Sequence, residues 1–169
     1  MLLYHGSNTK IKQINLTLSR PFKDFGRGFY LTTIFDQAVL MAKRTSRIFP
    51  GVPHVTVFEF DEAVLNNSDL SVKAFGEPSS EWATFVLNNR NRNFQDAADP
   101  NCNHDNKYDI VTGPVANDDI ALLFRTFSNG VIDMDALVKG MKYKNLNNQY
   151  SFHTSSAIAF LTKTGADAV

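Results

Sequence analysis

The hydrophobic pattern of the chain alternates between the periods of strands and helices. Short apolar runs bounded by turn residues predict strands, because aromatic and β-branched residues favour extended backbone; these runs are residues 2–4, 29–32, 54–60, 108–115 and 149–153. Within 54–60 the side chains alternate, and we expect the face that carries Phe58 and Phe60 to be buried.

Helical spacing of apolar residues fills the intervals between these runs. It predicts helices over 35–47, from Ser79 through Val86, over 118–127 and 133–139, and after Thr154, which has the side chain of an N-cap. Thr33 and Asp36 resemble a capping pair for the first of these helices. Strands interleaved with short helices, without regular βαβ spacing, predict an α+β fold.

Two segments lack this pattern. Residues 88–107 contain seven asparagines and few apolar anchors, which predicts a long surface loop with a functional or mobile role. The small and polar residues 163–169 are expected to form a frayed tail. Neither segment separates two cores, so we expect a single domain over 1–169.

Composition narrows the class of protein. The chain has 169 residues, with 17 basic and 17 acidic side chains, so it lacks the broad positive field of non-specific nucleic-acid binders. Cys102 is the single cysteine and excludes an internal disulfide. The first residues lack a signal-peptide pattern, and no apolar run approaches the roughly 18 residues of a membrane span. We therefore expect a cytoplasmic protein without membrane contact, although delivery as an effector stays open.

Several familiar motifs are incomplete. Asp24-Phe25-Gly26 matches a kinase tripeptide, but the chain is too short for a kinase. The segment that begins at Asp99 starts like a calcium loop and lacks its glycine and its final glutamate. We predict no metal site.

Three predicted strand edges carry polar groups that suit one ligand. The first contains His5-Gly6-Ser7, the second Gly26-Arg27-Gly28 followed by Tyr30, and the third begins at Gln149. Glycine allows close approach to the backbone, arginine suits phosphate, and tyrosine can stack on a flat ring. These groups fit a ligand with a planar amide-bearing ring, a sugar hydroxyl and a pyrophosphate.

The first two segments carry a family resemblance. His-Gly-Ser after a short strand, with Phe-Gly-Arg-Gly-Phe-Tyr-Leu about 20 residues later, resembles the ADP-ribosyltransferase superfamily. The similarity is to the branch with poly-ADP-ribose polymerases and diphtheria toxin, and more closely to a group of small bacterial proteins, over roughly residues 2–162. The resemblance implies a split fold of two mostly antiparallel sheets around an NAD cleft, with flanking helices.

The same resemblance implies roles for individual residues. His5 would bind the adenosine ribose, the Gly6 backbone the nicotinamide carboxamide, and Tyr30 the nicotinamide ring. Ser7, Arg27 and Gly28 complete the implied NAD-binding set. Gln149 takes the third catalytic position with His5 and Tyr30, where the family usually has a glutamate that contacts the nicotinamide ribose.

Departures from the family pattern limit the implied activity. Gln149 carries no negative charge, and Ala38 and Met41 lie where polymerases have a serine and a second tyrosine. The resemblance therefore implies mono-ADP-ribosyl transfer from NAD to a macromolecule, with protein favoured over nucleic acid as the acceptor, as in a toxin or effector. Glu81 is a candidate replacement acid. NAD hydrolysis, non-catalytic binding of NAD or ADP-ribose, and a protein-interaction module built on residues 88–107 are the alternatives.

Overall fold

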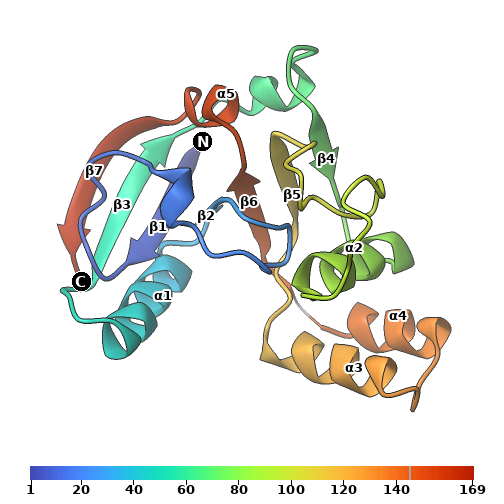
Figure 1. The fold of residues 1–169 in the computed structure, drawn as a ribbon. Helices are drawn as coiled ribbons and strands as arrows, with labels where there is room; N and C mark the ends of the chain where they lie inside the picture. The colour runs from blue at the N-terminus through green and yellow to red at the C-terminus, as the bar shows by residue number, and fades with distance from the viewer. Residues whose placement is uncertain (145) are drawn as a thin grey trace.

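A computed structural model describes residues 1–169 except Asn145. Within the described residues, seven strands form one mixed sheet in the order β4-β5-β6-β2-β1-β3-β7 (Figure 1). The strands are β1 (Leu2–Ser7), β2 (Phe29–Thr32), β3 (His54–Glu59), β4 (Val72–Ala74), β5 (Ile110–Pro114), β6 (Asn148–Phe152) and β7 (Thr162–Ala168). The helices are α1 (Phe35–Ile48), α2 (Ser80–Arg90), α3 (Asp118–Ser128), α4 (Met134–Lys142) and α5 (Ser155–Ile158), with 3₁₀ turns at Leu16–Leu18 and Glu62–Asn66.

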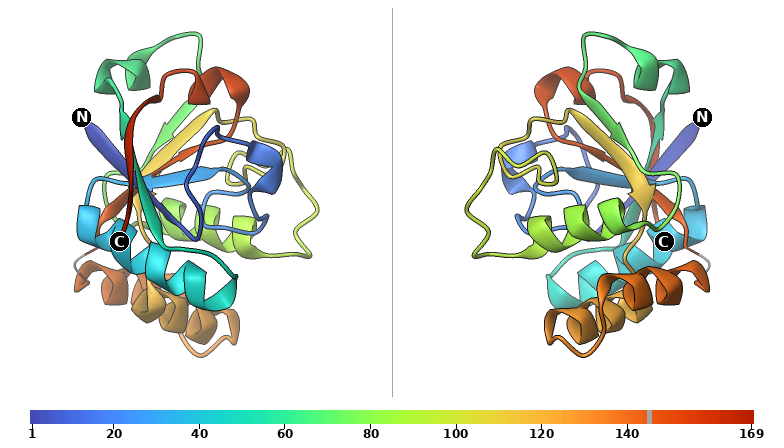
Figure 2. Two further views of the ribbon diagram at one scale, coloured as in Figure 1. Left: turned by 90° about the vertical axis from the view of Figure 1, so that its left-hand side faces the viewer. Right: turned by 90° about the vertical axis from the view of Figure 1, so that its right-hand side faces the viewer.

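Strands β1, β3 and β7 form one half of the sheet and are antiparallel. β1 pairs with β3 along its whole length, from Leu2 opposite Glu59 to Ser7 opposite His54. Helix α1 packs on this half through Ala38 and Ala42, whose small side chains let its backbone approach Gly6 of β1. Figure 2 shows α1 lying along this part of the sheet.

Strands β2, β6, β5 and β4 form the other half. β2 pairs with β6, and β6 with β5, in antiparallel ladders, whereas the short β4 runs parallel to β5. Helix α2 packs on one face of this half, and α3 and α4 pack against each other and against α2 beyond the strand ends (Figure 1). Apolar residues of the three helices form a core around Trp82 and Phe85. The opposite face is covered by a second cluster that includes Leu3, Phe29 and Phe152.

The two halves meet at a narrow junction. Among the described residues, β1 and β2 share a single paired position, Tyr4 opposite Thr32. Beyond this pair the two strands separate. Among the described residues, the edge of β1 that faces β2 therefore has no strand partner at His5 and Gly6, whereas the other edge is paired with β3. One continuous sheet with a one-pair junction therefore replaces the expected pair of separate sheets.

Most predicted elements are confirmed, but the predictions of a cap at Thr33, of a frayed tail and of a surface loop over 88–107 are wrong in whole or in part. The helix caps at Ser79 and Thr154 form as expected, since each side chain accepts a hydrogen bond from the first turn. Thr33 does not cap α1, because the hydroxyl of Thr32 instead accepts the Ile34 N–H and donates to Gln37. The tail expected to fray forms β7, which pairs with β3 through backbone bonds that its small side chains do not reveal.

The asparagine-rich segment is partly helix and partly an anchored loop. Its first residues belong to α2, and Asn89 is buried and accepts the Asn103 N–H at 2.9 Å. The Lys107 ammonium donates to the carbonyls of Ala97 and Asp99. Bonds of asparagine and lysine side chains, together with the buried Cys102, therefore tie this loop to the core.

Candidate functional site

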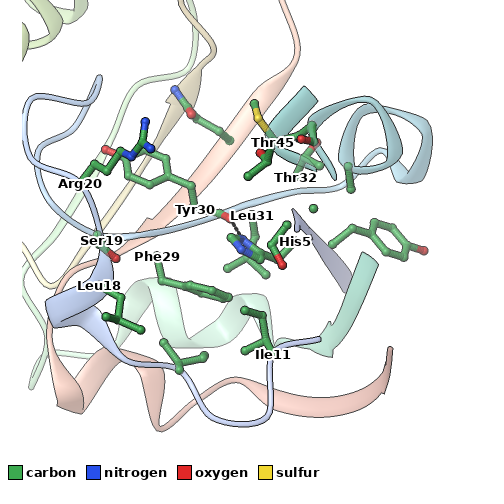
Figure 3. Close-up of a pocket in the computed structure, with 18 of the residues that line it drawn as sticks. His5, Ile11, Leu18, Ser19, Arg20, Phe29, Tyr30, Leu31, Thr32 and Thr45 are labelled. Atoms are coloured by element: carbon green, nitrogen blue, oxygen red, sulfur yellow. Dashed lines mark hydrogen bonds between the residues drawn. The ribbon is translucent and has the colours of Figure 1, made fainter. Parts of the chain in front are cut away.

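A pocket of about 420 Å³ opens where β1 and β2 separate. Its walls come from β1, β2, the loop between them, one side of α1 and the start of β6 (Figure 3). Phe29 and Tyr30 are neighbours in β2 and point to opposite faces of the sheet, and both line the pocket. The pocket therefore passes through the junction of the two halves and reaches side chains from both faces.

His5 is held in one protonation state and one tautomer. Its Nδ1 lies 2.8 Å from the carbonyl oxygen of Tyr30, which can only accept, so Nδ1 carries the proton. The ring stacks on Phe29 with centroids 4.3 Å apart. Burial, with a smaller contribution from the Lys23 charge, lowers the pKa of His5 to about 4, against the opposing effect of the Tyr30 bond. His5 is neutral at pH 7 and presents Nε2 as a hydrogen-bond acceptor.

Tyr30 offers its ring to the pocket and uses its hydroxyl within the protein. The hydroxyl accepts the Phe25 N–H at 3.0 Å and donates to the Gly26 carbonyl at 2.7 Å. Burial and the charge of Asp24 raise the pKa of this phenol, so it stays neutral. The Lys23 ammonium lies 5.6 Å from the ring centroid. Tyr30 therefore shapes the turn before β2 and leaves an aromatic surface for packing.

Gly6 and Ser7 line the pocket, and the structure gives each a packing or turn role as well. A Cβ on Gly6 would overlap the carbonyl oxygen of Ala38, so glycine is required for the contact between β1 and α1. The Ser7 hydroxyl bonds to the backbone of Thr9. Toward the pocket, these two residues present the β1 backbone edge that faces β2, which has no strand partner there among the described residues.

Gln149 lies at the end of the pocket nearest β6 and is buried beside a charged pair. Its Nε2 donates to Oδ2 of Asp24 at 2.9 Å and to the Pro114 carbonyl at 3.3 Å. Asp24 also forms a salt bridge with Arg90, at 2.6 Å. The sequence pattern did not indicate this partnership, because Asp24 appeared there only within an incomplete kinase motif.

Arg27 lies outside the residues that line the pocket, so its expected phosphate contact is not supported. Its side chain is exposed, and its carbonyl accepts a hydrogen bond from Nδ1 of His153. Gly28 lines the pocket, but its lack of a side chain is also needed to fit the His153 ring. The positive charges at the pocket belong instead to Arg20 and Lys23.

Arg20 and Lys23 were missed because they lie in an irregular segment without a motif. The available signal was two cations just before the Asp24-Phe25-Gly26 turn, in a loop between two candidate strands. The Arg20 guanidinium lies over the Phe49 ring, 4.3 Å from its centroid. Desolvation lowers the pKa of the Lys23 ammonium, with Asp24 acting in the opposite direction.

Glu81 lies outside the residues that line the pocket. Its carboxylate forms a 2.7 Å ion pair with Lys73, whose ammonium lies over the rings of Phe75, Phe85 and Tyr108. This pairing accounts for Glu81, which does not line the pocket described here. The structure thus brings together His5, Gly6, Ser7, Gly28, Tyr30 and Gln149, and leaves Arg27 and Glu81 outside.

Comparison with known proteins assigns the chain to a family. Residues 1–162 match the model of the family described as "Protein of unknown function (DUF3990)", so the chain belongs to that family. No curated protein shows significant similarity. None of the helices in the described residues is long and apolar enough to cross a lipid bilayer.

Proposed function

We propose that this member of the DUF3990 family binds NAD in the pocket between β1 and β2 and transfers one ADP-ribose to a macromolecule. The observation that carries the proposal is the convergence of His5, Tyr30 and Gln149, from three different strands, on one pocket. The resemblance of the flanking motifs to ADP-ribosyltransferases supports the same ligand.

Four chemical parts of NAD have a suitable partner in the pocket: a ribose hydroxyl, the carboxamide, the nicotinamide ring and the diphosphate. A ribose hydroxyl can donate to Nε2 of His5, and the nicotinamide carboxamide can pair with the free edge of β1 at Gly6. The Tyr30 ring offers a surface for the nicotinamide ring. Arg20 and Lys23 supply positive charge for the diphosphate.

The proposed transfer breaks the bond between the ribose C1′ and the nicotinamide nitrogen. Its electron pair leaves with neutral nicotinamide, and positive charge develops at C1′. A lone pair of the acceptor forms the new bond to C1′, and the acceptor releases a proton to solvent. The amide oxygen of Gln149 places the negative end of a dipole near this charge, which stabilises it less than a carboxylate does.

Two other functions use the same site. Water in place of the acceptor would make the protein an NAD glycohydrolase. Non-catalytic binding of NAD or ADP-ribose is favoured by one observation: Gln149 is neutral, and its amide is already bonded to Asp24. For the transfer reaction, the acceptor is proposed to be a protein and not a nucleic acid, since the chain carries equal numbers of basic and acidic residues.

Nicotinamide release from NAD tests the proposal. We expect release by the purified protein with bacterial lysate, and loss of at least about tenfold in His5→Ala, since a buried hydrogen bond to the ligand is removed. His54→Ala is the matched control, because His54 also bonds a backbone carbonyl through Nδ1 but lies away from the pocket. Release without lysate would indicate hydrolysis. NAD binding without release would indicate the non-catalytic alternative. The absence of both binding and release would reject the proposal.

A further inference from the structure

Asp24 is a buried carboxylate whose two oxygens are both used by the protein. Oδ1 accepts from Nε and Nη2 of Arg90, at 2.9 and 2.6 Å. Oδ2 accepts the Ala116 N–H at 3.1 Å and Nε2 of Gln149 at 2.9 Å. The side chain of Asp24 is 12% exposed, so these bonds compensate a charge that water largely does not reach.

The surroundings of the Gln149 amide determine which of its ends faces the pocket. The two groups nearest Nε2 are Oδ2 of Asp24 and the carbonyl of Pro114, and both can only accept hydrogen bonds. A flipped amide would place Oε1 against these two acceptors and lose both bonds. Nε2 therefore faces Asp24, and Oε1 is left for other partners.

We propose that Asp24 is a positioning residue that holds the Gln149 amide with its oxygen turned toward the pocket. In this orientation Gln149 is an acceptor only, and it selects a ligand hydroxyl over a ligand acceptor. The identity of that hydroxyl, a ribose hydroxyl of NAD, rests on the proposed function. The orientation itself rests on the contacts of Asp24 and Pro114.

The same contacts give a reason why position 149 has an amide and not the glutamate that is usual in ADP-ribosyltransferases, which the sequence resembles. A glutamate at 149 would place a second carboxylate against Asp24 and the Pro114 carbonyl, with Arg90 as the cation shared by both. Like charges at this separation cannot both stay ionised without cost. Gln149→Glu alone is therefore expected to destabilise the fold. Replacing Asp24 by asparagine in that variant should restore part of the lost stability, because only one carboxylate then remains.

Hydrogen exchange of the Gln149 side-chain amide, followed by NMR, tests the orientation without any ligand. We expect slow exchange in the wild type and at least about tenfold faster exchange in Asp24→Ala, because its charged acceptor is gone. Asp109→Ala is the matched control, since Asp109 also ties two segments together, through the Ser71 N–H and the Thr154 hydroxyl. It should leave the Gln149 protons unchanged. Equal exchange in the wild type and Asp24→Ala overturns the proposal.

A second pair of variants keeps the test valid if Asp24→Ala fails to fold. Gln149→Glu should have a lower melting temperature than the wild type. The double variant Asp24→Asn/Gln149→Glu should have a higher melting temperature than Gln149→Glu, because one of its two carboxylates has become an amide. If adding Asp24→Asn lowers the melting temperature further, Asp24 does not select the amide and the proposal is wrong.

A double-mutant cycle on NAD affinity links the orientation to the ligand. Asp24→Ala should weaken NAD binding by roughly tenfold in the wild-type background and by less than about twofold in Gln149→Ala, since its effect passes through that amide. Equal weakening in both backgrounds assigns Asp24 a general structural role and overturns the positioning. A wild-type protein that binds no NAD overturns the proposed function and the choice of hydroxyl, while the exchange measurement still decides the orientation.

Discussion

The two ends of the pocket each present a hydrogen-bond acceptor, and different physical effects hold each acceptor in place. At His5, desolvation keeps the ring neutral, and one hydrogen bond to the Tyr30 carbonyl directs the acceptor Nε2 to a ligand. At Gln149, a buried ion pair between Asp24 and Arg90 holds the amide nitrogen and leaves the oxygen as acceptor. The first end depends on an uncharged environment and the second on a charged one.

This difference shows where the site is most sensitive to substitution. The Gln149 end depends on a compensated buried charge, so removal of one partner leaves the other exposed to a large desolvation cost. The His5 end depends on close packing of β1 against α1 and on stacking, whose losses are smaller and local. Both ends offer acceptors, so the proposed ligand would donate to them, as the hydroxyls of a sugar can.

Loss of the cation at the Gln149 end is expected to have the largest effect. Arg90→Met leaves the Asp24 carboxylate buried without its partner, and we expect a loss of about 3 kcal/mol in the free energy of unfolding. Denaturant unfolding at pH 7 measures it. Lys144→Met is the control, because its pair with Asp119 is solvent-exposed and should contribute less than about 1 kcal/mol. Equal losses of stability in the two variants would show that the Asp24–Arg90 pair contributes no more than an exposed ion pair.

Disturbing the packing at the His5 end comes next. Gly6→Ala forces the new methyl group into the backbone of α1, and we expect a loss of about 2 kcal/mol in the free energy of unfolding. Gly76→Ala should stay within about 0.5 kcal/mol, because a Cβ there meets no atom within 4 Å. Thermal or denaturant unfolding distinguishes the two, and an unaffected Gly6→Ala would contradict the close contact between β1 and α1.

Charge at the pocket should affect affinity more than stability. Arg20→Ala/Lys23→Ala is expected to weaken NAD binding roughly tenfold and to reduce its salt dependence, since two cations no longer face the diphosphate. Arg27→Ala should bind NAD like the wild type, because its side chain lies outside the pocket. Calorimetric titration at two salt concentrations measures both. A larger loss in Arg27→Ala would restore the phosphate contact expected from the motif.

The smallest expected effect on NAD binding is a flat pH profile. Because the folded-state pKa of His5 is about 4, below its ordinary 6.5, Nε2 stays an acceptor from pH 8 down to about pH 5. NAD affinity should therefore be constant over this range and fall only as the pH approaches 4, when protonation removes the acceptor. Titration of NAD at several pH values checks this. A fall in affinity centred near pH 6.5 would show that the ring is not desolvated.

Protonation of His153 should also destabilise the protein at low pH, just as protonation of His5 removes its acceptor. Burial lowers the folded-state pKa of His153 to about 4. Its neutral form is favoured in the folded protein, so its stabilisation is complete above pH 6.5 and is lost as the pH falls toward 4. The full effect of such a shift is about 3 kcal/mol. His153→Gln should flatten the decrease of melting temperature below pH 6.5, whereas an unchanged slope would place the acid sensitivity elsewhere.

The sequence by itself determined most of the helices and strands and six of the residues that meet in the pocket, which are His5, Gly6, Ser7, Gly28, Tyr30 and Gln149. The period of apolar residues and the caps at Ser79 and Thr154 act within a few residues, so they can be recognised without knowing what packs against them. His5, Tyr30 and Gln149 were recognised because their flanking residues form a motif in a fixed order, not because their geometry could be derived.

Tertiary structure alone decided the contacts between segments far apart in the chain. It joined the expected two sheets through Tyr4 and Thr32, and it gave the polar tail a partner strand in β3. It also paired Glu81 with Lys73, placed Arg20 and Lys23 in the lining of the pocket, and placed Asp24 against Gln149. A charged residue has many reachable partners in an unfolded chain. Burial in the folded protein selects one, because a charge removed from water must be compensated where the packing has placed it.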